Sequence, residues 1–217
     1  MHGPKEPIPS PRRSRGRPRV GEGEIIESEL LEGALREFLK HGYGGTSMAQ
    51  IVKSLGISKT TLYSRYPSKN DLFRAIMSRQ IERLSARTAL QTNGHWLDLG
   101  MGLRAYANRS LEISLAGDLR EVNRLIYSES GRFPELGAAA AERTQLGIAQ
   151  IAEFIEQCGE RDGIPIRDAK GVAEAFIFML RGWYVDVLLN NVPVDPSTRE
   201  TWVEKAVHAI LNGREEW

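Results

Sequence analysis

Apolar residues recur at helical spacing along most of the chain, starting near Glu24. The first predicted helix presents four apolar side chains at i, i+3, i+4 and i+7, on one face: Leu31, Ala34, Leu35 and Phe38. Three glycines within the segment 42–45 then end this helix. The pattern predicts an amphipathic helix that packs one face against a core.

Two shorter helices are predicted between residues 47 and 66. Ser47 followed by Gln50 forms a capping box, and Gly56 ends the helix that it opens. Ser58 caps the second short helix, and Pro67 breaks the chain before a longer helix that begins near residue 68. The apolar residues expected to hold the two short helices together are Ile51, Val52, Leu55, Ile57 and Leu62.

Beyond residue 90 the pattern remains helical, because no period-2 alternation bounded by turn residues indicates a strand. The expected helices run roughly over 68–90, 96–115, 118–129, 134–159, 168–190 and 197–212. We therefore predict an all-α fold. Its parts would be a flexible arm at 1–22, a three-helix domain at 23–80 and a larger helical domain at 81–217.

The segment 172–189 is apolar on nearly every side. A helix of this kind is covered on two sides, here by its own core and by a second subunit. The last helix carries a matching apolar stripe: Trp202, Val203, Ala206, Val207 and Ile210. We predict a homodimer in which the helices near 168–190 and 197–212 pair with their symmetry mates into a four-helix bundle.

Composition excludes several classes of protein. With 217 residues, 41% hydrophobic and 26% charged, the chain can build one large core or two modest ones, which excludes disorder for most of it. No apolar run approaches the roughly 18 residues of a membrane span, and the N-terminus is unlike a signal peptide, so we expect a cytoplasmic protein. The single cysteine, Cys158, excludes an intrachain disulfide, and the sequence predicts neither a metal site nor a cofactor.

The net charge of +1 hides a strong asymmetry. Residues 1–80 carry 14 lysines and arginines against 8 acidic residues, whereas residues 81–217 carry 15 against 20. A basic front joined to an acidic back indicates that only the front meets a polyanion.

Residues 48–66 fit the requirements of a helix-turn-helix. These are a short positioning helix, a tight turn holding a glycine, and a second helix whose N-terminal side chains reach the DNA bases. Hydroxyl, ammonium and guanidinium groups donate hydrogen bonds to phosphates and base edges. The polar side chains expected to face outward here are Lys59, Thr60, Thr61, Ser64 and Arg65.

The stretch TSMAQIVKSLGISKTTLYSRYPSKNDLF, residues 46–73, resembles the DNA-binding signature of the tetracycline-repressor (TetR/AcrR) family. The resemblance covers residues 24–80 well. Beyond them it rests on the helical layout and on RFPEL, residues 132–136, which is similar to a stretch in the sensor domains of some members. It implies a transcriptional repressor that is not an enzyme, binds a palindromic operator as a homodimer and is released by a small-molecule effector.

The resemblance also implies roles for individual residues. It makes Thr46 a phosphate contact and has Tyr63 and Lys69 clamp phosphates on either side of the recognition helix. Each also has a simpler explanation, since Thr46 could be only a helix cap, Tyr63 a packing residue, and Lys59 and Lys69 solvated charges. The full set expected to bind DNA is Arg15, Arg17, Arg19, Thr46, Ser47, Ser58, Lys59, Thr60, Thr61, Tyr63, Ser64, Arg65, Tyr66 and Lys69.

The arm contains five of the ten prolines and the run Arg12-Arg-Ser-Arg-Gly-Arg-Pro-Arg19. Its Arg-Gly-Arg-Pro core is typical of arms that enter a narrow A·T minor groove. Such binding would add affinity and salt dependence rather than specificity. The alternative is a solubilising tail.

A ligand pocket is implied among the helices over 96–190, coupled to the first domain through the helix that begins near Ser68. Candidate lining residues are aromatic and polar side chains in otherwise apolar helices: Trp96, Tyr106, Arg109, Asn123, Tyr127, Phe154, Phe178 and Trp183. Core packing or a dimer contact is the alternative for each. Arg109 and Arg181 stand out, because an arginine on a mostly buried helix needs an anionic partner, either a ligand or one of Glu112, Glu174 and Asp186.

Two other functions fit the sequence less well. A constitutive DNA-binding factor would keep the first domain and lack a ligand. An all-α enzyme or small-molecule carrier would need catalytic or metal motifs, yet the four histidines are scattered and no G-x-S-x-G elbow occurs. Gly100 and Gly102 follow no predicted strand, so they indicate close helix packing rather than a dinucleotide loop.

Overall fold

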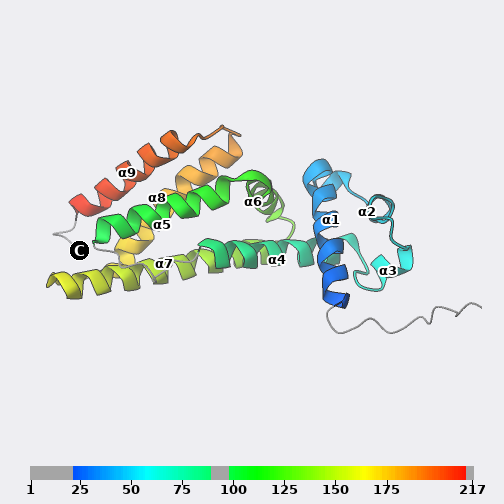
Figure 1. Ribbon diagram of the computed structural model, residues 1–217, viewed down its shortest axis with the longest axis horizontal. Coiled ribbons are helices and arrows are strands. Elements are labelled where there is room, and N and C mark those ends of the chain that lie inside the picture. Colours follow the sequence, from blue (N-terminus) through cyan, green and yellow to red (C-terminus); the bar gives the residue numbers. More distant parts are fainter. Residues whose placement is uncertain (1–21, 89–97, 214–217) are drawn as a thin grey trace, which may run out of the picture.

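The computed structural model describes residues 22–88 and 98–213, and all regular structure in these ranges is helical (Figure 1). The helices of the described part are α1 (Glu22–Gly45), α2 (Met48–Leu55), α3 (Lys59–Tyr63), α4 (Lys69–Thr88), α5 (Leu99–Leu115), α6 (Gly117–Glu129), α7 (Pro134–Asp162), α8 (Ala169–Leu189) and α9 (Pro196–Asn212). The all-α fold class is confirmed. None of these helices is long and apolar enough to cross a membrane.

The local signals in the first domain act as predicted. Gly42 interrupts α1 with φ 68° and ψ 172°, a conformation that glycine adopts without strain. Ser47 and Gln50 form the capping box of α2, and Gly56 ends that helix in the left-handed region. The Ser58 hydroxyl accepts a hydrogen bond from a backbone N–H in the first turn of α3. The ends of both short helices are therefore set by residues within a few positions of them.

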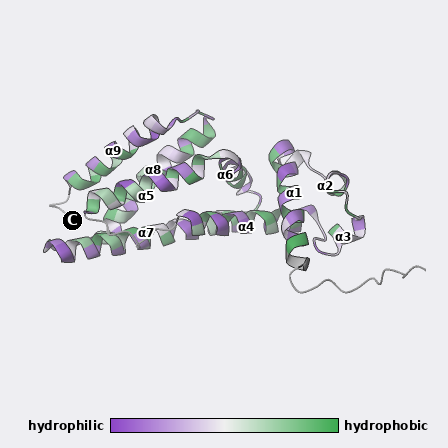
Figure 2. Cartoon of the chain, in the orientation of Figure 1, coloured by the Kyte–Doolittle hydropathy of each residue, from purple (hydrophilic) through white to green (hydrophobic). Residues whose placement is uncertain are grey.

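The molecule is elongated, with α1–α3 at one end and α5, α7, α8 and α9 in the body (Figure 1). The helix α4 runs from the small domain along the larger one and packs on α1, α5 and α7. Hydrophilic residues recur between the hydrophobic ones along α7 and α9, as expected for helices with one buried face (Figure 2). The helix α4 therefore joins the two ends of the molecule physically.

Two hydrophobic cores hold these helices. The larger lies among α5, α7, α8 and α9. The second contains the apolar face of α1 with Leu62, Leu72 and Phe73, and it continues into α6 and the start of α7 through five buried residues: Val122, Leu125, Ile126, Phe133 and Leu136. The core of the small domain is therefore not closed near residue 80 but shared with the larger domain.

Gly102 provides the close helix packing that the sequence indicates. It is buried on α5, and the ring of Phe154 on α7 lies where a side chain would begin. Phe154 is itself only 6% exposed and belongs to the larger core. The absence of a Cβ at position 102 thus lets an aromatic ring pack directly on the α5 backbone.

Gly102→Ala is expected to destabilise the fold. An added Cβ would lie 2.2 Å from Cζ and 2.4 Å from Cε1 of Phe154. The buried ring has to shift, and overpacking of this kind costs about 1–3 kcal/mol in the free energy of unfolding. Urea denaturation followed by circular dichroism measures the loss.

Gly137→Ala on α7 is the matched control. There the new Cβ would make only an ordinary contact, 3.8 Å from Cβ of Ser130. Since alanine favours a helix over glycine by about 1 kcal/mol, this variant is expected to be at least as stable as the parent protein. Equal stability changes in the two variants would contradict the packing argument.

Candidate functional site

Apolar side chains on the inner side of α2 and α3 hold the helix-turn-helix on α1, and the carboxylate of Glu27 holds the end of α3. Ile51 and Leu62 are fully buried between α1, α2 and α3. The Tyr66 hydroxyl, just after α3, donates a 2.7 Å hydrogen bond to Oε1 of Glu27 on α1, and Arg65 lies 3.7 Å from the same carboxylate. Burial, with the hydrogen bond to Glu27, raises the pKa of Tyr66 to about 12, so the phenol stays protonated and keeps donating at neutral pH. Recognition helix α3 is therefore fixed against α1.

The outer side of α2 and α3 forms a surface rich in hydrogen-bond donors. Seven of the residues predicted to bind DNA are exposed: Ser47, Ser58, Lys59, Thr60, Tyr63, Ser64 and Arg65. Thr61 is half-buried, and its hydroxyl pairs with that of Ser58. The sequence 38–70 contains five lysines and arginines and no acidic residue. This surface has the charge and the donors that a nucleic-acid backbone requires.

Three residues predicted to bind DNA, Thr46, Tyr66 and Lys69, make hydrogen bonds within the protein. Tyr66 is 8% exposed and bonded to Glu27. Thr46 is 2% exposed, and its hydroxyl donates to the carbonyl oxygens of Gly42, at 2.8 Å, and Glu37, at 3.2 Å. This geometry does not support a phosphate contact from the Thr46 hydroxyl, because its only donor already caps the end of α1.

Lys69 also serves the end of α1. Its Nζ lies 2.9 Å from the carbonyl oxygens of Tyr43 and Thr46, and 4.3 Å from the centroid of the Tyr43 ring. A lysine ammonium has three donors, so one N–H remains for a phosphate. The predicted residues Arg15, Arg17 and Arg19 lie outside the described residues.

An aromatic cluster joins the two domains. We call Phe38, Tyr43, Phe73 and Phe133 the junction cluster. Phe133 lies just before α7, and its ring centroid is 5.0 Å from that of Phe73 and 5.2 Å from that of Tyr43. The Tyr43–Phe133 pair is edge-to-face and the Phe73–Phe133 pair is tilted, and aromatic pairs of this kind favour a defined relative orientation of the rings.

The RFPEL segment, residues 132–136, supplies the contacts that the larger domain makes at this junction. Besides Phe133, Arg132 lies over the Tyr43 ring at 4.9 Å, and Glu135 forms an ion pair with Arg74 of α4. Leu136 is buried in the core of the small domain. The start of α7 is thus bound to the DNA-binding domain at several points.

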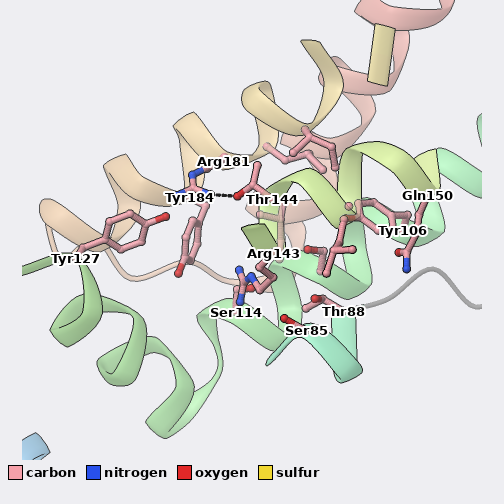
Figure 3. A pocket seen from close by; sticks show the side chains of 16 residues that line it. Ser85, Thr88, Tyr106, Ser114, Tyr127, Arg143, Thr144, Gln150, Arg181 and Tyr184 are labelled. Carbon is pink, nitrogen blue, oxygen red and sulfur yellow. Dashed lines mark hydrogen bonds between the residues drawn. The ribbon is translucent and has the colours of Figure 1, made fainter. Parts of the chain in front are cut away.

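The larger domain contains a polar pocket with a cavity volume of about 110 Å³, lined by α4, α5, α6, α7 and α8 (Figure 3). We call it the central pocket. Its lining residues are Ser85, Thr88, Tyr106, Ser110, Leu111, Ser114, Tyr127, Arg143, Thr144, Leu146, Gly147, Gln150, Ile177, Leu180, Arg181 and Tyr184. Because Ser85 and Thr88 belong to α4, any occupant lies against the helix that carries the DNA-binding domain.

Only two of the residues predicted to bind a ligand, Tyr106 and Tyr127, line the central pocket. Asn123 is buried next to it, where its side-chain amide donates to the carbonyl oxygen of Ser114. Phe154 belongs to the core. Trp96 lies outside the described residues.

The other three predicted ligand residues lie away from the pocket. Phe178 is 51% exposed on α8, and Trp183 stacks on Trp202 of α9 with ring centroids 5.2 Å apart. Arg109 is exposed, and its Nε donates to the carbonyl oxygen of Arg87. The exposed guanidinium of Arg109 therefore needs no anionic partner in the core.

Arg181 reaches the central pocket but has neutral partners. It donates to Oγ1 of Thr144 and to the carbonyl oxygen of Ala140, and it lies 5.6 Å from the centroid of the Tyr127 ring. In the described part of the chain, none of the three carboxylates proposed for Arg109 and Arg181 pairs with either.

Sequence reasoning missed Arg143, Thr144 and Tyr184. Arg143 follows an alanine-rich stretch of α7, where a charged residue is typical of a solvent-exposed face. Tyr184 falls in a segment that is apolar on nearly every side. No local spacing distinguishes them, because the pocket is assembled from helices up to a hundred residues apart in the chain.

Family comparisons cover both domains. Residues 30–76 match the model of bacterial regulatory proteins of the tetR family, and residues 101–213 match the model of the AefR-like transcriptional repressor C-terminal domain. Among curated relatives, the HTH-type transcriptional repressor ComR of Escherichia coli is 38% identical over 80 residues, which is 37% of this chain and 36% of ComR. The chain thus aligns with little more than a third of the length of that relative.

Solved structures resemble nearly the whole chain. A putative TetR-family regulator from Mesorhizobium loti has a TM-score of 0.71 at 24% identity, with 88% of this chain and 97% of that one covered. The flavonoid-responsive regulator FrrA has a TM-score of 0.66 at 27% identity with the same coverage. Together with the two family models and the geometry of α2 and α3, these similarities identify the chain as a member of the tetR family of bacterial regulatory proteins.

Proposed function

We propose that this protein is a ligand-responsive transcriptional repressor that acts in the cytoplasm, binds a palindromic operator as a homodimer and is released by a small-molecule effector in the central pocket. The observation that carries the proposal is the continuity of the packing. A donor-rich, acid-free surface on α2 and α3 is linked through α4 and the junction cluster to a polar pocket. Membership of a family of regulators supports the same function.

Operator recognition would use the exposed donors of α3. Lys59 and Thr60 lie at its N-terminal end, the part of a recognition helix that reaches base edges. Tyr63 is 45% exposed, so its hydroxyl is free to reach a phosphate beside the groove. A helix of five residues covers few base pairs, and two copies one helical turn apart would provide the missing specificity.

Dimerisation is proposed through α8 and α9. Phe178 and Leu189 of α8 are 51% and 69% exposed, and the stacked Trp183 and Trp202 continue the apolar face onto α9. Large apolar side chains gathered on one face are typical of an interface. A two-fold axis through this face would give the two-fold symmetry that a palindrome needs.

Release by an effector is proposed to work through α4. An occupant of the central pocket would contact Ser85 and Thr88 and favour one position of this helix. If that position changes the spacing of the two recognition helices, operator affinity falls by the differential affinity of the ligand for the two states. Coupling of this kind typically changes affinity by about 5- to 150-fold.

Selection from a random duplex library at moderate salt tests the whole proposal. An enriched palindrome is the expected result, followed by its release when small molecules are screened against the complex. Binding without enrichment would indicate an architectural factor. An enriched operator that no pocket ligand releases would favour a constitutive regulator.

Lys59→Ala is expected to weaken operator binding and to flatten its salt dependence. Losing one phosphate contact in each subunit lowers the slope of log affinity against log salt by about 0.9 per contact. Fluorescence anisotropy over a salt series measures both quantities. The control is Lys205→Ala, which changes an exposed lysine on α9 and is expected to leave the slope unchanged. An unchanged slope for the Lys59 variant as well would show that Lys59 does not contact the DNA.

Thr46→Val tests whether the Thr46 hydroxyl serves the fold or the DNA. The substitution removes the hydroxyl that donates to the carbonyls of Gly42 and Glu37, so the free energy of unfolding is expected to fall by about 0.5–1.5 kcal/mol. The slope of affinity against salt stays at the parent value. Thr46→Ser retains the hydroxyl and both properties, whereas a lower slope with full stability in the valine variant would restore the phosphate contact.

Phe178→Glu is expected to convert the dimer into monomers, because it places a charge in the centre of the proposed apolar interface. Light scattering coupled to size exclusion at micromolar concentration gives the mass directly. Met101→Glu changes an equally exposed apolar residue on α5, 46% exposed, and keeps the parent mass. A dimeric mass for the Phe178 variant would place the interface elsewhere.

A further inference from the structure

Arg143 brings an uncompensated charge into the central pocket. It is half-buried on α7, and no described residue forms a hydrogen bond or ion pair with it. None of the described residues that line the pocket is acidic. A guanidinium held away from water loses solvation free energy that only an anion can restore fully.

Arg181 is the second guanidinium in the pocket, and one of its nitrogens already has partners. Its Nη1 donates to the Thr144 hydroxyl and the Ala140 carbonyl, and the guanidinium lies over the Tyr127 ring. Arg143, which has no such partner among the described residues, is therefore the cation whose donors are all available to an incoming ligand, and Arg181 adds positive potential.

Tyr184 provides an independent sign of a missing partner. Its side chain is 4% exposed, and its hydroxyl has no hydrogen-bond partner among the described residues. Buried hydroxyls almost always form a hydrogen bond, because a buried hydroxyl without one costs free energy. Tyr184 lines the central pocket, so a pocket ligand is the partner that this hydroxyl can reach.

Arg143 and the tyrosines form one constellation. Figure 3 shows the Arg143 guanidinium between Tyr184 on one side and Tyr106 on the other. Burial raises the pKa of both phenols, and the charge of Arg143 offsets part of this rise in each. Its field therefore acts on both hydroxyls, which remain protonated and able to donate at neutral pH.

The pocket also limits the size of its ligand. Its cavity of about 110 Å³ is of the same order as the roughly 150 Å³ of an apolar cavity that accepts benzene, so it has room for about one ring. Tyr127 and Tyr184, with ring centroids 6.2 Å apart, offer aromatic surface on one wall. Polar walls around one ring-sized space suit a compact molecule with a single acidic group.

We propose that the central pocket binds a small organic carboxylate with one aromatic ring, whose carboxylate pairs with Arg143 and accepts a hydrogen bond from the Tyr184 hydroxyl. A guanidinium binds a carboxylate through two parallel N–H donors, a geometry that a neutral amide cannot match. This inference rests on the proposed function, in which the same pocket holds the effector.

Direct binding to the full-length protein without DNA tests the inference. Benzoate and cinnamate are the anionic probes, and benzamide and cinnamide are their neutral isosteres, each titrated by ligand-observed NMR. We expect the carboxylates to bind at least tenfold more tightly than the amides. Equal affinity within a pair, or no binding of either carboxylate up to 10 mM, roughly the weakest affinity that such a titration follows, would overturn the proposal.

Variants then locate the carboxylate. Arg143→Met keeps an unbranched apolar stem and removes the guanidinium. It is expected to weaken benzoate binding at least tenfold with little effect on benzamide, while Arg143→Lys recovers part of the loss. Arg167→Met, an exposed arginine outside the pocket, is the matched control and binds as the parent does. Unchanged benzoate affinity in Arg143→Met, with a parent-like melting curve, would overturn the assignment. If that variant does not fold, the comparison of benzoate with benzamide on the parent protein still tests whether the pocket binds a carboxylate.

Two further arms separate related outcomes. Phenyl phosphate tests the headgroup, and its tighter binding than benzoate would overturn the choice of a carboxylate. Operator binding measured with and without saturating benzoate tests the proposed function separately. Carboxylate binding that leaves operator affinity unchanged would contradict effector release and support the assignment of the pocket. Release of the operator by a neutral compound alone would support effector release and contradict the assignment of a carboxylate to the pocket.

Discussion

The packing of Phe133 between Tyr43 and Phe73 is the contact on which the rest of the structure depends. Alone, the three-helix domain would expose the apolar side of Phe73 and of α1, since a domain of this size has little core of its own. The RFPEL segment covers that surface with a buried ring and surrounds it with charged contacts at its rim. The domain of α1–α3 is consequently held in one orientation by the larger domain.

This constraint explains how a distant pocket can act on α3. The helix α7 begins at Pro134, beside the junction cluster, and reaches Arg143 nine residues later, about 14 Å along its axis. The helix α4 likewise joins Phe73 in the junction cluster to Ser85 and Thr88 in the central pocket. Two rigid helices thus connect the same two places. A ligand that moves α7 relative to α4 must disturb the junction cluster, because close-packed rings do not deform gradually.

The sequence predicted elements well where local chemistry decides them. The ends of α2, α3 and α4 depend on Ser47, Gly56 and Ser58 and on the hydroxyl of Ser68 next to Asp71, all within a few residues of the helices they cap. The sequence predicted the roles of polar side chains less well where the partner lies far away in the chain, because spacing does not tell such a partner from solvent. Tyr66 bonds to Glu27 across 39 residues, and Lys69 bonds to the Tyr43 carbonyl across 26, so neither internal role could be deduced from spacing along α3 and α4.

The central pocket could not be predicted from local sequence patterns, because its lining residues come from the inner faces of five helices. Arg109 and Arg143 look alike in sequence, each a single arginine on a helix with a core face. Packing turns Arg109 outward to the Arg87 carbonyl and Arg143 inward, toward Tyr106 and Tyr184. A fold optimised only for stability would place an apolar side chain at position 143, where the guanidinium finds no hydrogen-bond or ion-pair partner among the described residues. Such a departure from stable packing is expected where a chain has been selected for binding, since binding there restores what folding alone leaves unpaired.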